Sequence, residues 1–505
     1  MSRRQRLLLA LALLVGAAAR IGFGWGADGT FHPDDIHQSL EPAHGVVYGS
    51  GLRVWEFEAG ARPWTVPGVY VLLLGLLKLL GVTAPEGYTL VARLLAALLT
   101  ATWPWLCFRL GRALHSPRAG LGAAWLCATW YVLVLVAPRA FGHTFSVTFA
   151  LWACARVAES PPAPLDTASR RGHLVTGLLL GLAFAFRYQE GLAAAGLALF
   201  LVATRRARAV AWLAAGAAAP VLAVGLLDWA TWGLPFHSLF AYLHTNVGQD
   251  VASVFGRMPW HFYLVRLLVL LGPAAALLLF LPLARRPALL LAATVGGLVL
   301  VAHSAIGHKE FRFVLLAVLV LCTAAACGVA EALERLERVT SARGAVTLAA
   351  ALLVAWVAAS AQRAGAVTFG DFGLYAGLPE ERATPWSFRR DCNRALARVG
   401  RRSDLCAVAV VPVGNATGLH RIGSTGGFTY LHRGAPLVVG TPSPAAFPLV
   451  NYVIACPGAG EPARRFADLE VAGRVGSCTV YRHPGRVACD PSALARHSRQ
   501  WRWSR

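Results

Sequence analysis

Apolar stretches long enough to cross a lipid bilayer follow one another along this 505-residue chain. A helix needs about 20 predominantly apolar residues to span the hydrocarbon core. The chain is 56% hydrophobic and only 14% charged, which is typical of a polytopic membrane protein. We therefore predict an α-helical membrane protein with about eleven transmembrane helices. The expected spans are residues 6–25, 87–108, 119–137, 144–158, 172–187, 189–204, 208–230, 262–283, 287–304, 313–331 and 344–361.

Arginine-rich loops predict which way the chain crosses the membrane. Cytoplasmic loops carry an excess of Lys and Arg, and Arg3, Arg4 and Arg6 precede the first span. Residues 66–82 are also apolar, but counting them as a span would place the later arginine clusters outside. We expect 66–82 to be an external re-entrant or interfacial helix, which leaves all basic clusters cytoplasmic. These clusters lie at 109–118, 170–171, 205–208, 285–286 and 335–343. The basic residues behind the net charge of +22 therefore determine the membrane topology and do not indicate nucleic-acid binding. The first run could instead be a cleaved signal peptide, which leaves the orientation unchanged.

The polar C-terminal part, residues 362–505, is predicted to be an external α/β soluble domain, because an odd number of spans puts it outside. Residues 1–361 then form the membrane domain, with residues 26–86 as its first external loop. Five cysteines in apolar runs are expected to be buried. The other five show no zinc-site spacing, and four of them could pair in an oxidising compartment, in a connectivity that stays open. They are Cys392, Cys406, Cys456, Cys478 and Cys489.

The motif His32-Pro33-Asp34-Asp35 stands directly after the first span, on its external side. Two neighbouring carboxylates near a low-dielectric boundary can have their pKa values pushed apart, which makes one of them a usable general base. A helix N-cap followed by a solvated turn would use the same residues without chemistry. The predicted topology brings further polar clusters to this face, at 139–143, 187–190, 231–261 and 308–312. Ionisable groups at the ends of membrane helices are costly unless paired or functional, so this convergence favours a site.

The acidic motif and the segment after it, from Gln38 to His44, closely resemble the first luminal loop of the family 22 glycosyltransferases. These are polyprenyl-phosphate-mannose-dependent α-mannosyltransferases of the GT-C architecture. The resemblance covers residues 1–330, but the chain has Asp35 where the family usually has Glu and Val54 where it usually has Thr. It includes Trp55-Glu56, Arg62-Pro63-Trp64 and the family's second signature, His308-Lys309-Glu310-Phe311-Arg312-Phe313.

The resemblance implies an inverting hexosyltransferase. It would move a hexose, with mannose expected, from a polyprenyl-phosphate-linked donor to a sugar hydroxyl of a glycolipid or glycan. Such a transfer needs a carboxylate for the acceptor proton and cations for the departing phosphate. By the family motif, Asp34 is the expected base, and Asp35 is expected to orient the acceptor or tune its neighbour. The expected contacts to the donor phosphate are Lys309, Arg312, Arg187 and His308. The expected acceptor-binding residues are His32, Gln38, Glu41, Trp55 and Glu56.

No cofactor or metal is expected, because no glycine-rich nucleotide loop precedes a helix and no two histidines show metal-ligand spacing. The expected partners are the lipid-linked sugar donor, the acceptor and the bilayer, without nucleic acid. A transporter or flippase of lipid-linked sugars is the alternative, although its charges would lie at the membrane midplane. A non-catalytic scaffold would not need the acidic pair. Because Arg, Ala, Leu and Gly abound and lysine is almost absent, we expect a bacterial cytoplasmic membrane with an outward-facing site. The endoplasmic reticulum membrane is the other possibility.

Overall fold

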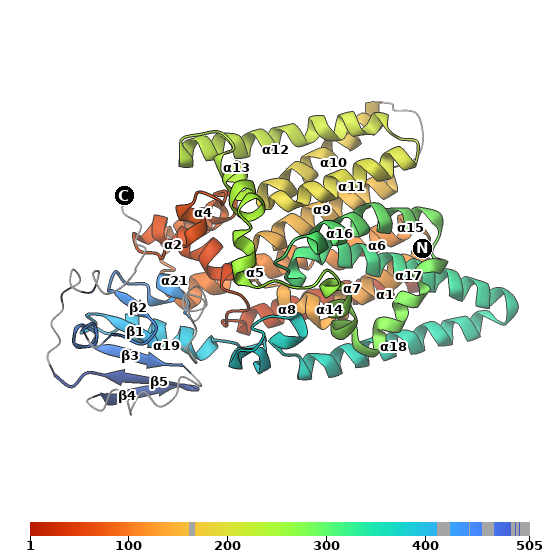
Figure 1. Ribbon diagram of the computed structural model, residues 1–505. Helices are drawn as coiled ribbons and strands as arrows, with labels where there is room; N and C mark the ends of the chain where they lie inside the picture. Colours follow the sequence, from red (N-terminus) through yellow and green to blue (C-terminus); the bar gives the residue numbers. More distant parts are fainter. Residues whose placement is uncertain are drawn as a thin grey trace.

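The computed structural model describes residues 1–160, 167–411, 425–443, 445–456 and 469–485, together with Asp490 and Leu494. The helices form one bundle, and a small sheet from the C-terminal part lies at one end of it (Figure 1). The predicted combination of a helical membrane part and a C-terminal α/β domain is confirmed.

Seven helical segments of the described residues are long and apolar enough to cross a membrane. They are α1 (Arg3–Gly26), α5 and α6 (Pro85–Leu114), α12 (Arg208–Trp232), α14 and η5 (Phe262–Leu283), α15, η6 and α16 (Arg286–Ala305), η7 and α17 (Phe311–Val339), and α18 (Ala342–Ala366).

The other four predicted spans are also helical, but they are shorter or more polar. They are α7 (Pro117–Thr129) with α8 (Tyr131–Val136), α9 (Gly142–Glu159), α10 (Thr167–Phe186) and α11 (Gly191–Ala203). The chain is extended at Trp130, between α7 and α8, and many residues of α7 and α9 are buried in the protein core. Protein rather than lipid surrounds much of α7 and α9, so apolar length constrains these two helices less. The excluded stretch forms α4 (Thr65–Leu79), whose 15 residues extend over about 22 Å, less than the roughly 30 Å of a bilayer core.

Glycines let two of the membrane helices approach closely. An added Cβ at Gly177 or Gly181 of α10 would collide with backbone carbonyls of α12, and one at Gly216 of α12 would collide with α10. Small residues four apart are typical of close helix contacts in membranes. The helices α9, α10 and α12 therefore form a tight layer that supports the loops at their external ends.

Short elements lie between the long helices and after the last of them, and they carry part of the sequence motifs, including Gln38, Glu56 and Arg312. In the first loop they are η1 (Ile36–Leu40), α2 (Glu41–Tyr48) and α3 (Trp55–Glu58). Further along the chain they are η2 (Tyr188–Glu190), α13 (His237–Leu243), η3 (His244–Gly248), η4 (Val251–Phe255), η7 (Phe311–Val314), η8 (Phe369–Phe372), η9 (Pro379–Arg382), α21 (Gly427–Leu431) and η10 (Phe447–Leu449).

The C-terminal sheet has the strand order β2-β1-β3-β5-β4. Its strands are β1 (Val408–Val411), β2 (Leu437–Val439), β3 (Tyr452–Ala455), β4 (Glu470–Val475) and β5 (Cys478–Arg482). The first three pair in parallel, whereas β5 pairs antiparallel with both β3 and β4. All residues of β1 and β3 are buried, as expected for apolar strands covered on both faces. The helix α19 (Arg390–Gly400) packs against β3, β4 and β5.

The cysteines of this domain pair in part as predicted. A disulfide joins Cys392 to Cys456, Cys406 is also disulfide-bonded, and Cys478 is a free thiol. The remaining cysteine, Cys489, lies outside the described residues.

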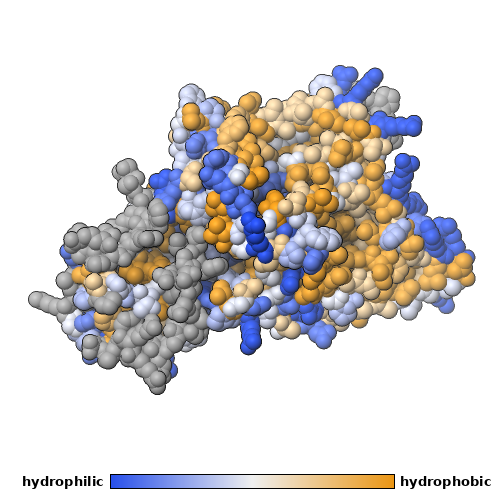
Figure 2. Space-filling model, in the orientation of Figure 1, coloured by the Kyte–Doolittle hydropathy of each residue, from blue (hydrophilic) through white to orange (hydrophobic). Residues whose placement is uncertain are grey.

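The surface shows where the arginine-rich loops lie. Figure 2 shows hydrophobic side chains over most of the helical bundle and hydrophilic ones gathered at the end that carries the N-terminus. Exposed arginines of the predicted cytoplasmic loops include Arg205, Arg208, Arg286 and Arg343. The arginine-rich loops and the sheet therefore lie at opposite ends of the molecule.

Candidate active site

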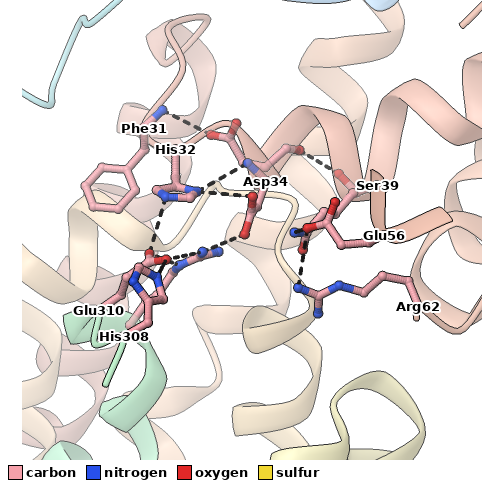
Figure 3. A network of polar contacts seen from close by, with 11 residues as sticks. Phe31, His32, Asp34, Ser39, Glu56, Arg62, His308 and Glu310 are labelled. Carbon is pink, nitrogen blue, oxygen red and sulfur yellow. Dashed lines mark hydrogen bonds and ion pairs between the residues drawn. The ribbon is translucent and has the colours of Figure 1, made fainter. Parts of the chain in front are cut away.

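The turn at the start of the first loop directs two neighbouring carboxylates to opposite sides. The Asp35 carboxylate folds back and accepts a hydrogen bond from the backbone N–H of Phe31 at 3.1 Å. The hydroxyl of Ser39 donates to the backbone carbonyl of Asp35 at 2.6 Å, which fixes the start of η1. Asp34, one residue earlier, is left free to face the interior of the loop cluster (Figure 3).

A network of ion pairs connects Asp34 to the second sequence signature. The guanidinium of Arg312 donates to the carboxylate of Asp34 at 2.6 Å and to that of Glu310 at 2.6 and 3.0 Å. His32 lies 3.4 Å from Asp34 and 3.3 Å from Glu310, and His308 lies 3.0 Å from Glu310. The two predicted signatures, 278 residues apart, thus meet in one cluster (Figure 3).

The network keeps its carboxylates ionised. Burial alone would favour protonated Asp34, but the charges of Arg312 and His32 outweigh it and hold the pKa of Asp34 well below its usual range. The same balance of burial against Arg312 and His32 lowers the pKa of Glu310. Burial lowers the affinity of His308 for a proton, yet its hydrogen bond to Glu310 leaves the pKa of His308 raised overall.

These residues line a cavity of about 340 Å³ at the end of the bundle that carries the C-terminal sheet (Figure 1). The first loop, the middle loop, the segment before α17 and the turn after η8 all contribute to its wall. Nine of the predicted site residues line it: His32, Asp34, Gln38, Trp55, Glu56, Arg187, His308, Lys309 and Arg312. Asp35 and Glu41 do not.

Asp35 does not line the cavity, which does not fit its predicted contact with the acceptor, while its alternative role of tuning Asp34 stays a prediction. Its carboxylate is buried and lies 3.8 Å from Arg139, which itself donates to the carbonyl of Gly29 at 2.8 Å. Burial raises the pKa of Asp35, and the charge of Arg139 offsets only part of this effect. Asp35 therefore holds the turn in shape.

Glu41 also has a position that does not fit acceptor binding. Its fully buried carboxylate accepts hydrogen bonds from the backbone N–H groups of Leu52, Phe428 and Thr429, each at 2.8 Å. The hydroxyl of Thr429 donates a further bond at 2.5 Å. Because Phe428 and Thr429 belong to α21, Glu41 joins the first loop to the C-terminal domain.

Lys309 lines the cavity, but its ammonium group points to backbone carbonyls. It donates to Met258 at 2.9 Å, to Gly307 at 3.5 Å and to Ile306. These three acceptors use the three protons of the ammonium group. The geometry therefore gives Lys309 no free proton for the predicted phosphate contact.

Donor atoms without a partner gather at the cavity instead. Arg187 donates to the carbonyl of Phe313 at 3.2 Å, while its Nη2 atom is buried without a partner. The same is true of the Nε atom of Arg62, which also lines the cavity. The Nε2 atoms of His143 and His303 are buried there without a partner as well, but His303 Nδ1 donates to the carbonyl of Val299 at 2.8 Å, so its Nε2 is an acceptor in the neutral ring. Buried donors that lack a partner are costly, and an anion would satisfy them.

The sequence offered unequal signals for these three additional residues. Arg62 stands inside a recognised motif, and His143 ends the external cluster 139–143. His303 lies in the apolar helix α16, outside every polar cluster that the sequence marked.

Another part of the wall, next to Arg62, carries groups suited to hydroxyls. Gln38 donates to the carboxylate of Glu56 at 2.7 Å, and Arg62 lies 3.9 Å from the same oxygen (Figure 3). Burial and the nearby charge of Asp34 raise the pKa of Glu56 to about 7, although Arg62 opposes them. Trp55 stacks on Phe255 with ring centroids 6.2 Å apart and closes this side.

Two clusters of the described residues have side chains that could hold a metal ion, and neither lines the cavity. One consists of Cys392, Cys456 and Cys478, of which the first two are bonded to each other. The other combines His115 with Glu331 and Glu334 near the predicted cytoplasmic end, where Arg285 already pairs with both carboxylates.

Comparison with protein families explains why these residues meet. The model of the Alg9-like mannosyltransferase family matches residues 12–385. The chain belongs to this family. The resemblance predicted from the two signatures is confirmed, and the match extends past α18 to the turn that closes the cavity.

Curated relatives agree with this assignment. The chain is 30% identical over 335 residues to GPI mannosyltransferase 3 of Yarrowia lipolytica, which covers 65% of this chain and 63% of that protein. It is 26% identical over 311 residues to GPI alpha-1,2-mannosyltransferase 3 of Xenopus laevis, covering 56% and 53%. The matches thus span between about half and two thirds of the length of these relatives.

Solved structures share the fold at low sequence identity. ArnT from Cupriavidus metallidurans, bound to undecaprenyl phosphate, has a TM-score of 0.58 at 12% identity, covering 95% of this chain and 98% of ArnT. The Archaeoglobus fulgidus oligosaccharyltransferase, in complex with Zn and sulfate, has a TM-score of 0.52 at 14% identity, covering 89% and 68%. The predicted GT-C architecture is confirmed.

Proposed function

We propose that this protein transfers mannose from a polyprenyl-phosphate-linked donor to a sugar hydroxyl of a glycolipid or glycan, with inversion at the anomeric carbon. One observation carries the proposal: the ionised carboxylate of Asp34 and the unpartnered donor atoms of Arg187 and Arg62 line the same cavity. A base and an anion site in one cavity are the two elements that such a transfer needs.

In the proposed reaction, the acceptor hydroxyl oxygen attacks C1 of the donor sugar while Asp34 takes the hydroxyl proton. The bond between C1 and the phosphate oxygen breaks on the opposite face, and the electron pair leaves with the polyprenyl phosphate. Arg187 and Arg62 stabilise the charge of this leaving group. Arg312 keeps Asp34 ionised before the reaction. Its Nη2 atom contacts Asp34 while its Nε atom contacts Glu310, so it can remain bound to Glu310 while Asp34 takes the proton.

The acceptor would lie against the wall formed by Gln38 and Glu56. Carboxylate and amide groups form hydrogen bonds with sugar hydroxyls. Because the acceptor is uncharged, such contacts still allow it to dissociate after the reaction. The names of the curated relatives favour a glycolipid acceptor. None of the relatives or structures reported above is named as a transporter, so nothing here supports the flippase alternative.

A transfer assay tests the proposal. Purified protein is incubated with radiolabelled polyprenyl-phosphate-mannose and a glycolipid extract, and we expect a labelled glycolipid in which mannose has the inverted anomeric configuration. Asp34→Asn should reduce this product by a factor of about 10²–10⁴. If the wild-type protein forms no labelled product but moves the intact donor across reconstituted vesicles, the flippase alternative replaces the proposal.

We place the cavity on the external side of a bacterial cytoplasmic membrane, with the lumen of the endoplasmic reticulum as the alternative. Ala59 is exposed in the first loop, and Ala207 is exposed between α11 and α12. An impermeant thiol reagent should label Ala59→Cys in intact cells and should label Ala207→Cys only after lysis. Labelling of both from outside would overturn the orientation.

A further inference from the structure

The end of the middle loop, residues 250–258, forms a thin wall between the cavity and the outside. Its inward side chains line the cavity, whereas Val254 is 77% exposed and Arg257 is also exposed. A single layer of chain therefore separates the proposed reaction from the surroundings. The lining residues of this wall are Ala252, Phe255, Gly256 and Met258.

This wall is attached to the segment before α17 by three hydrogen bonds. The N–H of Met258 donates to the carbonyl of Gly307 at 2.9 Å, and Lys309 returns a bond to the carbonyl of Met258 at 2.9 Å. The third joins His308 Nδ1 and the carbonyl of Gly256 at 3.3 Å. The two segments also fit closely, because a Cβ at Gly307 would approach the hydroxyl oxygen of Ser253 to 2.5 Å.

The ammonium group of Lys309 bonds to both segments at once. Its remaining protons go to Ile306 and Gly307, in its own segment, and only 3% of the residue is exposed. Removing the ammonium group would leave buried carbonyls without a partner and would loosen the wall at Met258.

We propose that Lys309 is a positioning residue that fastens the wall 250–258 and so keeps water away from the donor sugar during transfer. This inference rests on the proposed function. Without the wall, a water oxygen attacks C1 in place of the acceptor hydroxyl. The bond from C1 to the phosphate oxygen breaks, one water proton passes to Asp34, and free mannose and polyprenyl phosphate result.

The measurement is the ratio of free mannose released to mannose transferred, together with the donor KM. In Lys309→Met we expect this ratio to rise by about tenfold or more, because a closed site is what excludes hydrolysis. The donor KM should stay within about twofold, since the ammonium group does not reach the phosphate. Lys309→Arg should restore a ratio closer to that of the wild type, because its guanidinium has donors for the same carbonyls.

The chain offers a matched control in its only other lysine. Lys78 donates to the carbonyl of Val47 at 2.8 Å and does not line the cavity. Lys78→Met removes the same number of protons and should leave the ratio unchanged.

A second pair of variants keeps the test usable if Lys309→Met does not fold. Gly307→Ala leaves Lys309 in place, but its added Cβ would collide with the hydroxyl oxygen of Ser253 and push the wall outward. The ratio of free to transferred mannose should therefore rise. Ser253→Ala removes the colliding oxygen, and the double variant should return toward the wild-type ratio.

Two results overturn the inference. One is an increase of tenfold or so in the donor KM of Lys309→Met at an unchanged ratio, which would make Lys309 a phosphate contact. The other is an unchanged ratio in both Lys309→Met and Gly307→Ala. Either result requires a wild-type protein that transfers mannose, whereas a wild-type protein without transfer contradicts the proposed function itself.

Discussion

The first external loop has two faces whose carboxylates have different partners. On the cavity face, Asp34 is bound by the side chains of Arg312 and His32 and lines a cavity. On the opposite face, Glu41 is bound mainly by backbone N–H groups, and it does not line this cavity. A carboxylate at a cavity can meet a ligand, whereas one saturated by donors of the protein chain holds the chain in place.

The comparison also separates the two halves of the acidic pair. Asp34 and Asp35 are adjacent in sequence, yet their pKa values move in opposite directions, because Arg312 lies at 2.6 Å from Asp34 and Arg139 at 3.8 Å from Asp35. The closer cation stabilises the ionised form more. The pair was expected to have divided pKa values, and the structure assigns the lower one to the residue at the cavity.

The largest effect is expected from Asp34→Asn, which removes the base of the cavity face. Transfer should fall by a factor of about 10²–10⁴, the range of general-base removal. The unfolding temperature should change little, because Arg312 keeps both bonds to Glu310. The transfer assay and thermal unfolding in detergent measure the two quantities. Near-normal transfer by this variant would contradict the role of the cavity face.

Glu41→Ala should be the most damaging change on the opposite face, and its effect should be on stability. Three backbone N–H groups and one hydroxyl would lose a buried acceptor, which costs at least about 3 kcal/mol in total. Thermal unfolding and limited proteolysis of the C-terminal domain report this loss.

The control for this change is Glu86→Ala at the same interface. Glu86 pairs with Arg401, but both side chains are about half exposed, so the pair contributes about 0–1 kcal/mol. Equal destabilisation by the two variants would show that Glu41 has no special part in joining the domains.

A smaller effect is expected from Glu56, as a dependence of stability on pH. Its pKa is raised to about 7 in the folded protein, against an ordinary value of 4.5, so the folded state binds the proton more tightly. Its contribution to stability is therefore present below about pH 4.5 and is lost as the pH rises toward 7. Glu56→Gln, which mimics the protonated form, should not show this loss. Unfolding temperatures of both proteins between pH 5 and 8 should differ in slope; parallel curves would contradict the raised pKa.

The sequence predicted the helices and the two signatures. It did not predict which carboxylates of the first loop face the cavity and which hold the chain in place. Apolar length predicts a membrane helix, because the bilayer imposes it locally. By contrast, the partners of Glu41 are backbone groups up to 388 residues away, and no side-chain pattern marks them. Lys309 was conspicuous in an arginine-biased chain, but its acceptors are carbonyls, which every residue carries. Such roles depend on the tertiary structure alone.

The smallest effect is expected from Asp35→Asn, which tests the comparison at its closest point. The amide keeps an acceptor for the N–H of Phe31, and the lost charge is one that burial already disfavours. Arg139 keeps its bond to the carbonyl of Gly29, so it retains a partner. Transfer should fall by less than about tenfold, below the effect of a missing general base. The same assay measures it beside Asp34→Asn under identical conditions. If Asp35→Asn is inactive while Asp34→Asn is active, Asp35 rather than Asp34 acts as the base.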